Sequence, residues 1–592
     1  MRSPTEGRKS MAEKREKVKR SKFPRTFFVA NVMEIFERMA WYGFFAVSSL
    51  YMTSPIREGG LGFSSIQRGI LQGIIPFLLY LFPVVTGALA DRYGYRRTFL
   101  VAFSILTPAY FLLGQFTGFW PFFFAFLFVA VGAATFKPVV VGTVARTTDD
   151  SNKGIGFGIF YMIVNVGGFI GPLIAGYVRV ISWNLVFVMS TIWIACNFIP
   201  TIFFYKEPTT ESASATRRSL KKVLTDMQDV LGNARFALIV LPILILVMVS
   251  GGGWMDWGKT LTISALWLIL NLFWNFLARK DETAPWFKKK SKIGNWPFVL
   301  YLLILSGFWA SFNQIFITMP EYIRDFVETR DLVKFAGFFG HGFVNFIASV
   351  NVENLSERLG ELVQQYGAVQ DFGTAKVIFL ELVHLKVRVP LEEIMATMQQ
   401  LSAMGIPDQA AVTAVAREWI EKYRQVNPEY IINLDAGAII VFQVLVSWII
   451  DRWRPFPVLI VGTVVAGVGI GLGAVSTGSV AFGGFLAVVS IVIFAFGEMI
   501  ASPKSQEYVA RIAPSDKVAL FMGYYFVSIA LGNLFGGILS GWGYEKIAKG
   551  MDNPQLMWII FGGVGILTAI ALLFFNKTVV PRLEAQRQSN KK

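Results

Sequence analysis

Two glutamates and an arginine lie close together in a strongly apolar stretch near the start of the chain. Glu34, Glu37 and Arg38 follow the spacing of one helical face, and Trp41 continues that face one turn later. A charge at the centre of a membrane helix costs roughly 2.5 to 3.5 kcal/mol on insertion scales, so this cluster needs mutual or functional compensation. We therefore expect the face to look into a protein interior or a water-filled cavity, not into lipid.

Two further charges stand alone in apolar segments. Lys137 is an isolated ammonium group whose most stable state is an ion pair, so Glu34 or Glu37 is its natural partner. Protonation of that carboxylate would free the lysine. Glu498 follows the apolar run 489–496 and also requires a partner. A purely structural network of buried ions is the alternative interpretation of these charges.

The composition indicates a protein that crosses the membrane many times. The 592 residues are 54% hydrophobic, and the mean hydropathy is +0.53, well above the apolar share of soluble domains. The net charge of +16 lies mainly in loops between apolar segments, which fits membrane orientation better than nucleic-acid binding. The single Cys196 excludes an intrachain disulfide, and two histidines are too few for a histidine metal site.

Apolar segments of about 20 residues or more, the length that crosses a hydrocarbon core, occur in a six, two, six arrangement. We predict an all-α membrane protein with fourteen membrane helices: two six-helix bundles, an extra hairpin between them and a helical insert. The predicted parts are a basic cytoplasmic tail (1–25), an N-terminal bundle (26–205), a linker with the hairpin (206–294), a C-terminal bundle (295–322 and 432–577), the insert (323–431) and a second cytoplasmic tail (578–592).

The distribution of Lys and Arg between alternate loops predicts that both termini are cytoplasmic and that the insert is extracytoplasmic, as in a bacterial inner membrane protein. Apolar and charged residues alternate at helical spacing within the insert, which predicts a small helical domain outside the membrane. Binding of an unknown partner, contact with the cell envelope and a lid over the entrance are all open roles for it. We interpret His341 and His384 as ordinary surface residues.

A sequence resemblance adds to these observations. The segment from Gly87 to Arg97 resembles the cytoplasmic loop motif of the major facilitator superfamily. The resemblance implies two six-helix bundles that rock to expose a central site alternately. It also implies that charged residues of the motif fasten helices on the cytoplasmic face and act in gating, namely Asp91, Arg92, Arg96 and Arg97.

A narrower match concerns the charged cluster itself. The pattern Glu34-x-x-Glu37-Arg38-x-x-x-Tyr42-Gly43 resembles the signature of the proton-dependent oligopeptide transporters, the POT family. Further segments resemble the same family at Tyr80–Pro83, Phe136–Pro138, Phe160–Gly168, Phe308–Gln314 and Gly497–Pro503. The likeness therefore extends along most of the membrane part of the chain.

This resemblance implies roles for the charged residues. Protonation within the cluster of Glu34, Glu37 and Arg38, together with Lys137, is coupled to substrate binding and to the alternation of access. Lys137 meets the carboxyl end of a peptide, and Glu498 meets the amino end. The proton-coupling set is thus Glu34, Glu37, Arg38, Lys137 and Glu498, and the substrate-binding set is Trp41, Tyr42, Tyr80, Lys137, Asn165, Trp309, Gln314, Asp435 and Glu498.

Several positions depart from the family pattern. Phe45 stands where a basic residue is common, and Tyr525 stands where a tryptophan is usual. Asp435-Ala436 replaces the usual asparagine and proline, so Asp435 could favour a cationic group on the substrate, titrate as a second site or cap a helix. These changes make ordinary di- and tripeptide specificity less secure than the transport function itself.

The predicted function is proton-coupled symport that imports small peptides, such as di- and tripeptides, or peptide-like solutes by alternating access. The partners are the solute, protons and the bilayer, with no cofactor beyond the coupling proton. One alternative is a transporter of another organic anion, zwitterion or drug, and a second is a receptor that uses the insert as a binding module. We find no nucleophile, metal or phosphate-loop pattern in the sequence that would favour an enzyme.

Overall fold

The computed structural model describes residues 22–149, 152–208, 231–278, 285–403, 409–479, 481–513 and 518–581. Most of the predicted basic tail, a part of the linker and most of the C-terminal tail lie outside the described residues. Within them the secondary structure is helical, apart from two isolated bridges, Gly232 with Ile293 and Val387 with Arg424. The prediction of an all-α protein is confirmed.

The N-terminal bundle is built from helices whose ends follow local sequence signals. Ser64 and Gln67 form a reciprocal capping box at the start of α3, and Pro83 occupies the first turn of α4. Gly94 has a φ of 92°, a left-handed conformation that lets the chain turn sharply between α4 and α5. The bundle contains α2 (Arg25–Thr53), α3 (Ser65–Leu81), α4 (Pro83–Tyr93), α5 (Tyr95–Leu113), α6 (Phe119–Arg146), α7 (Lys153–Ile181) and α8 (Trp183–Cys196), which is followed by the short η2 (Pro200–Phe204).

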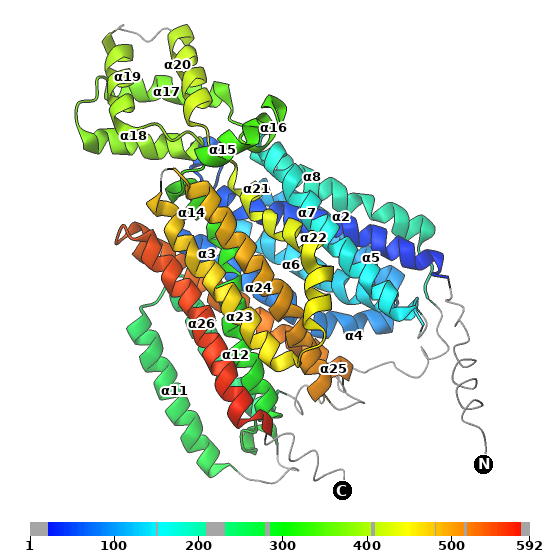
Figure 1. The fold of residues 1–592 in the computed structure, drawn as a ribbon. Helices are drawn as coiled ribbons and strands as arrows, with labels where there is room; N and C mark the ends of the chain where they lie inside the picture. Colours follow the sequence, from blue (N-terminus) through cyan, green and yellow to red (C-terminus); the bar gives the residue numbers. More distant parts are fainter. Residues whose placement is uncertain are drawn as a thin grey trace, which may run out of the picture.

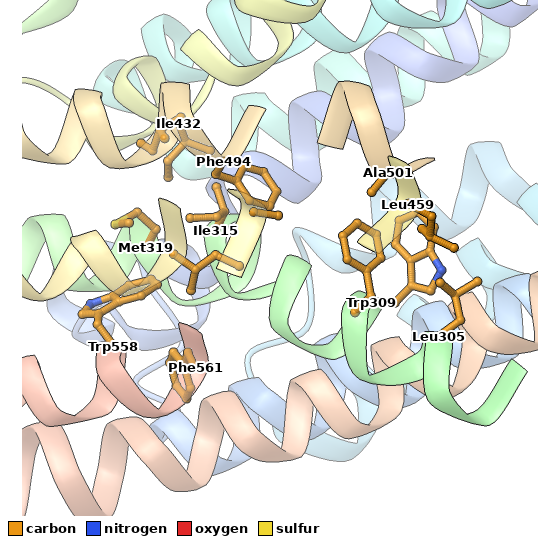
Figure 2. Close-up of a cluster of buried hydrophobic side chains, with 14 of the residues drawn as sticks. Leu305, Trp309, Ile315, Met319, Ile432, Leu459, Phe494, Ala501, Trp558 and Phe561 are labelled. Carbon is orange, nitrogen blue, oxygen red and sulfur yellow. The ribbon is translucent and has the colours of Figure 1, made fainter. Parts of the chain in front are cut away.

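The C-terminal bundle surrounds a large aromatic core. Figure 2 shows three aromatic residues of this core, Trp309, Phe494 and Trp558, which come from three different helices. The bundle contains α12 (Trp296–Phe312), α13 (Gln314–Ile317), α14 (Met319–Phe326), α21 (Pro428–Ile432), α22 (Leu434–Ile450), α23 (Pro455–Leu472) with η5 (Gly473–Gly478), α24 (Gly483–Ile512), α25 (Val518–Trp542) with η6 (Gly543–Lys549), and α26 (Pro554–Thr578).

The extra hairpin consists of α10 (Ala234–Gly251) and α11 (Trp257–Leu277). Leu244 and Met248 of α10 pack against residues of α3 and α25, so α10 is attached to both bundles. Figure 1 shows α11 along the outside of the molecule, beside α26. Leu266 and Phe276 of α11 are 61% and 81% exposed, as expected for a helix that faces acyl chains.

In the described part of the chain, twelve helices are long and apolar enough to cross a membrane. Two of the fourteen predicted spans are not among them. One is α2, which carries the charged cluster, and the other is divided between α3, with 17 residues, and α4, with 11 residues. The chain is therefore a multi-pass integral membrane protein.

Glycines allow the two bundles to approach closely where α3 meets α25. A Cβ atom on Gly69 would lie 2.4 Å from the carbonyl oxygen of Gly537, and one on Gly537 would lie 2.5 Å from Cα of Gly73. Only glycine fits at such a distance, because any side chain would force the helices apart. The α3–α25 contact is a tightly packed seam between the bundles.

The described part of the insert contains the six helices α15 to α20, and four of them form a small domain with its own core. Figure 1 shows α17 to α20 beyond the ends of the spans, with α15 and α16 between this domain and the bundles. Trp419, Met398 and Leu359 lie in the core of the domain. The helices are α15 (Arg330–Gly337), α16 (His341–Ile347), α17 (Val352–Tyr366), α18 (Phe372–His384), α19 (Leu391–Ala403) and α20 (Gln409–Tyr423).

The insert contacts both bundles. Glu381 of α18 forms an ion pair with Arg57, which lies in the loop after α2 of the N-terminal bundle. Arg388 donates hydrogen bonds to the carbonyl oxygens of Arg324 and Asp325 at the end of α14, at 3.1 Å and 3.3 Å. The insert thus bridges the two bundles at the face from which it emerges, here called the insert side.

His384 does not lie on an ordinary surface, in contrast to our expectation, whereas His341 is exposed as expected. His384 lines a cavity of about 370 Å³ between the insert and the bundles, together with Glu58, Arg179 and Lys386. Burial, with a smaller effect of the Arg324 charge, lowers the pKa of His384 from 6.5 to about 3. Its neutral form is therefore the one that the folded insert accommodates.

We predict that the stability of the insert falls as the pH drops below 6.5. The unfolded chain binds a proton at His384 more readily than the folded chain, so the stabilisation is complete above 6.5 and is lost as the pH falls towards about 3. Protease cleavage of the insert should therefore accelerate on the acid side of pH 6.5, and less so in His384→Gln. His341→Gln is the matched control, and an equal acceleration in all three proteins would contradict the prediction.

Candidate functional site

The charged cluster of α2 is buried inside the N-terminal bundle. Glu34, Glu37 and Arg38 are only 3%, 0% and 3% exposed. The Arg38 guanidinium forms an ion pair with Glu37 and lies 3.3 Å from Glu34 Oε1. One oxygen of each glutamate, Glu34 Oε2 and Glu37 Oε1, has no hydrogen-bond partner. Two carboxylates thus share one cation, and each keeps a free position that a proton could occupy.

Lys137 of α6 is not paired as we expected. No ion pair joins it to a carboxylate within 4 Å among the described residues, because Arg38 already holds Glu34 and Glu37. Its Nζ lies 4.4 Å from the centre of the Tyr80 ring, a cation–π contact. Tyr80 in turn stacks on Phe526 of α25, with ring centres 6.1 Å apart. Lys137 is therefore in contact, through aromatic rings, with the C-terminal bundle.

A cavity of about 310 Å³ lies between the bundles and brings most of the predicted substrate-binding residues together. Its lining includes Trp41, Tyr42, Tyr80 and Asn165 from the N-terminal bundle, and Trp309, Asp435 and Glu498 from the C-terminal bundle. The Arg38 guanidinium lies 5.6 Å from the centre of the Tyr42 ring, so the charged cluster is adjacent to the cavity wall without lining it.

The C-terminal wall of this cavity carries unpaired polar groups. Asp435 Oδ1, Glu498 Oε2 and Trp309 Nε1 are buried and have no hydrogen-bond partner within the protein. Buried polar atoms are normally paired, so unpaired ones that line a cavity mark positions where a ligand or water binds. In contrast, the amide of Asn165 donates to the carbonyl oxygen of Tyr161 at 2.9 Å.

Gln314 lies outside the cavity. It is fully buried and donates hydrogen bonds to the carbonyl oxygens of Ala310 and Gly536, at 2.8 Å and 2.9 Å. Its side-chain oxygen accepts a bond from Thr318 at 2.7 Å. The structure therefore gives Gln314 a part in holding the broken helix α12–α13–α14 against α25.

The predicted gating residues lie at the face opposite the insert. Asp91 forms a 2.8 Å ion pair with Arg146 of α6, and Arg96 donates to the carbonyl oxygens of Thr201 and Ile202. Arg92 and Arg97 are exposed. These contacts stay within the N-terminal bundle, and in the described ranges no ion pair joins the bundles at this face.

Ion pairs between the bundles lie instead on the insert side. Arg68 of α3 and Glu321 of α14 are both fully buried and approach to 3.0 Å. Arg179 of α7 and Glu429 of α21 form a bidentate pair with distances of 2.6 Å and 2.8 Å. Charge-assisted bonds of this geometry are among the strongest in proteins. The structure is therefore closed on the insert side.

Our sequence analysis missed these four residues, although a signal was present. Arg68 lies in a predicted span, where the argument applied to Glu34 would have demanded a partner. Glu321 and Glu429 lie at the borders of the insert, where carboxylates are common and carry little information. Only the folded chain brings residues 250 or more positions apart into contact.

The comparison with known families agrees with this architecture. The family model of the Major Facilitator Superfamily matches residues 30–369 and 428–592. The chain belongs to the major facilitator superfamily. The family and its relatives are transporters and not enzymes, which confirms the prediction of a transporter from the sequence. The predicted fold class is confirmed as well.

The relatives with similar sequences include proteins that are named as peptide transporters. The chain is 34% identical over 161 residues to a peptide transporter of Yersinia enterocolitica, an alignment that covers 26% of this chain and 31% of the relative. It is 26% identical over 345 residues to a di-/tripeptide transporter of Lactococcus lactis, covering 51% of this chain and 69% of the relative. The chain thus matches about a third of the length of the first of these relatives.

Solved structures extend the similarity of the fold. A POT family transporter in complex with a thioalcohol-conjugated peptide aligns with a TM-score of 0.58 and 17% identity, covering 95% of this chain and 97% of the other. A peptide transporter mutant in complex with alafosfalin aligns with a TM-score of 0.59 and 18% identity, covering 95% of each chain. At these identities the structures establish the fold.

We predict that Glu321→Gln strongly destabilises the protein. The variant leaves the fully buried Arg68 without a carboxylate, and removing one partner of a buried ion pair costs about 3–5 kcal/mol. The temperature of thermal unfolding in detergent should fall accordingly. The control is Glu418→Gln, which removes a 57% exposed carboxylate paired with the 53% exposed Lys422 and should change stability by only about 0–1 kcal/mol. Equal shifts in both variants would contradict a special role for the buried pair.

Proposed function

We propose that the protein is a proton-coupled symporter that imports small peptides, such as di- and tripeptides, or peptide-like solutes. The observation that carries this proposal is that, among the described residues, a cation and two carboxylates without ion-pair partners stand on opposite sides of the central cavity. Lys137 lies behind the Tyr80 ring of the N-terminal wall, where Arg38 is already paired with Glu34 and Glu37, and the C-terminal wall presents Asp435 and Glu498. A zwitterion fits between such walls with its carboxylate towards one bundle and its ammonium towards the other.

The size of the cavity supports a small solute. A volume of about 310 Å³ lies at the lower end of the roughly 300–1,000 Å³ typical of small-molecule sites. Aromatic walls and charges at the two ends recognise the termini and backbone of a peptide more than its side chains. Such a site favours broad selectivity among short peptides.

Coupling to protons follows from the charged cluster. Arg38 is held by two carboxylates, so protonation of either one weakens its pairing and allows the cation to reorient. A proton that moves inward gains about 2.3 kcal/mol per 100 mV of membrane potential, which is comparable to the rearrangement of an ion pair. No cofactor beyond the coupling proton is required.

Alternating access supplies the transport step. The insert-side ion pairs of Arg68 and Arg179 must separate to open the site on that side, and the bundles then close at the opposite face. With the termini cytoplasmic, as in a bacterial inner membrane, the arrangement described here exposes its site towards the cell interior. Uptake then proceeds from the insert side to the cytoplasm.

A second candidate within transport is another zwitterion or a solute with an additional cationic group. Asp435 favours it, because this carboxylate is 3% exposed, lines the cavity and has an unpaired oxygen. Competition of labelled dialanine uptake by amino acids, longer peptides, cationic drugs and anions in proteoliposomes separates the candidates. Absence of any competition by peptides would exclude the leading substrate class, and binding without uptake would indicate a receptor.

We predict that Glu37→Gln uncouples transport from protons. The amide preserves the size of the side chain but cannot gain or lose a proton, so uptake driven by a proton gradient should be lost while exchange of internal for external dialanine persists. Both are measured in proteoliposomes with labelled dialanine. The exposed Glu418→Gln serves as the control and should retain both activities. Gradient-driven uptake by the Glu37 variant at the normal rate would refute the coupling role.

We predict that Glu498→Gln weakens the binding of substrates with a free amino terminus. A hydrogen bond to a charged group contributes about 1.5–3 kcal/mol, so the KM for dialanine should rise roughly 10- to 100-fold. N-acetylated dialanine lacks the ammonium group, and its inhibition constant should change little. Comparison with Asp435→Asn shows which carboxylate of the wall holds the amino terminus, and an equal loss of affinity for both ligands would argue against this contact.

A further inference from the structure

An apolar groove of about 860 Å³ lies on the insert side, where the short helices α15 and α16 meet the spans. One wall is formed by Phe169 and Leu173 of α7, in the N-terminal bundle. The remaining walls come from the insert and the C-terminal bundle, with lining residues that include Leu332, Phe346, Leu434 and Phe485. The groove therefore crosses the boundary between the bundles, and it shares only Asn433 with the lining of the central cavity.

The few polar groups of the groove are already engaged in hydrogen bonds. Asp331 accepts bonds from the backbone amides of Leu332 and Phe485, both at 2.8 Å. Asn433 donates to the carbonyl oxygen of Phe169 at 3.0 Å, and Tyr430 donates to that of Leu173 at 3.3 Å. A ligand of this groove consequently meets mainly apolar surface among the described residues, so an apolar ligand fits it best.

Four exposed phenylalanines form a cluster at the groove, and two of them, Phe335 and Phe343, line it. Phe335, Phe338, Phe339 and Phe343 are 60%, 87%, 66% and 44% exposed. The ring of Phe335 contacts those of Phe338 and Phe339, and Phe339 contacts Phe343, with ring centres 5.5 to 6.3 Å apart. Each exposed ring would cost free energy in water, at about 25 cal/mol per Å² of apolar surface. A cluster of this kind marks a surface that contacts something apolar.

The surroundings identify the occupant. The groove is lined in part by residues of α7, α22 and α24, which are membrane spans. Leu434 of α22 and Phe485 of α24 line the groove and are also exposed on the surface of these spans. Acyl chains already cover those faces in the bilayer. Figure 1 shows α15 and α16 directly above the ends of the spans, with the α17–α20 domain farther out.

We propose that an acyl chain of a bilayer phospholipid occupies this groove, and that α15 and α16 lie flat in the membrane interface with their phenylalanine rings among the acyl chains. The first part of the insert is then a membrane-anchored collar, and only α17 to α20 project into water. An interfacial helix of this kind buries its apolar face about 5–10 Å into the boundary between headgroups and acyl chains. A lipid in the groove touches both bundles while the insert side is closed.

The single cysteine of the chain makes the test direct. In a Cys196→Ser background, nitroxide labels are placed at Phe338→Cys and Phe343→Cys in vesicles of phosphatidylethanolamine and phosphatidylglycerol. The controls are Leu266→Cys on the lipid-facing α11 and Gln400→Cys on the exposed surface of α19. We expect oxygen to reach both test labels as it reaches Leu266, and a polar nickel chelate to be excluded from them but not from Gln400.

Two outcomes would overturn the interfacial placement. Access of the nickel chelate equal to that at Gln400 would put α15 and α16 in water. Protection from both reagents would mean that protein covers the rings, for example a second copy of the chain. All four labelled positions are exposed, so the labels leave the packed core unchanged.

The groove itself is tested with a phosphatidylcholine that carries a photoactivatable diazirine on its acyl chain. We expect adducts on the groove walls, at residues 331–347 and 482–488, and a loss of these adducts in Phe343→Ser. The control variant Phe276→Ser on α11 should leave them unchanged, since Phe276 is even more exposed, at 81% against 44% for Phe343, but does not line the groove. Absence of adducts on these walls would overturn the lipid site. Neither result depends on the identity of the transported solute.

Discussion

The cost of placing charge inside a membrane governs this structure. Three of the buried guanidiniums in the bundles are held by carboxylates: Arg38 by Glu37 within one helix, and Arg68 by Glu321 and Arg179 by Glu429 between the bundles. The attraction compensates the loss of hydration only while the partners stay together. Because two of these pairs join the halves of the molecule, the arrangement that satisfies the charges is also the arrangement that closes the insert side.

Much of the fold was predictable from the sequence because the constraints were local. Apolar length defined the spans, and helical spacing placed Glu34, Glu37 and Arg38 on one buried face. Most predicted binding residues lie around one cavity, since positions that match the sequence pattern of a family occupy the same places in the shared fold. Residues such as Tyr42 and Glu498 needed only the correct helix and the correct face.

The remaining features depended on contacts between distant segments. Lys137 contacts the ring of Tyr80 because the carboxylates of Glu34 and Glu37 are paired with Arg38. The spacing of residues in the sequence does not reveal this competition between the two cations. The side-chain amide of Gln314 donates both of its hydrogen bonds to backbone carbonyl groups near a break in its own helix. His384 is enclosed only because the insert folds back onto the bundles. In each case the deciding neighbour lies in another helix.

The path of the chain through the insert has a mechanical consequence. The chain enters the insert from α14 and leaves it into α21, and both helices belong to the C-terminal bundle. If the two bundles rock as proposed, the insert moves with the C-terminal half, while the ion pair between Glu381 and Arg57 links it to the other half. A molecule that bound the projecting domain from outside would then influence this motion without reaching the interior of the protein.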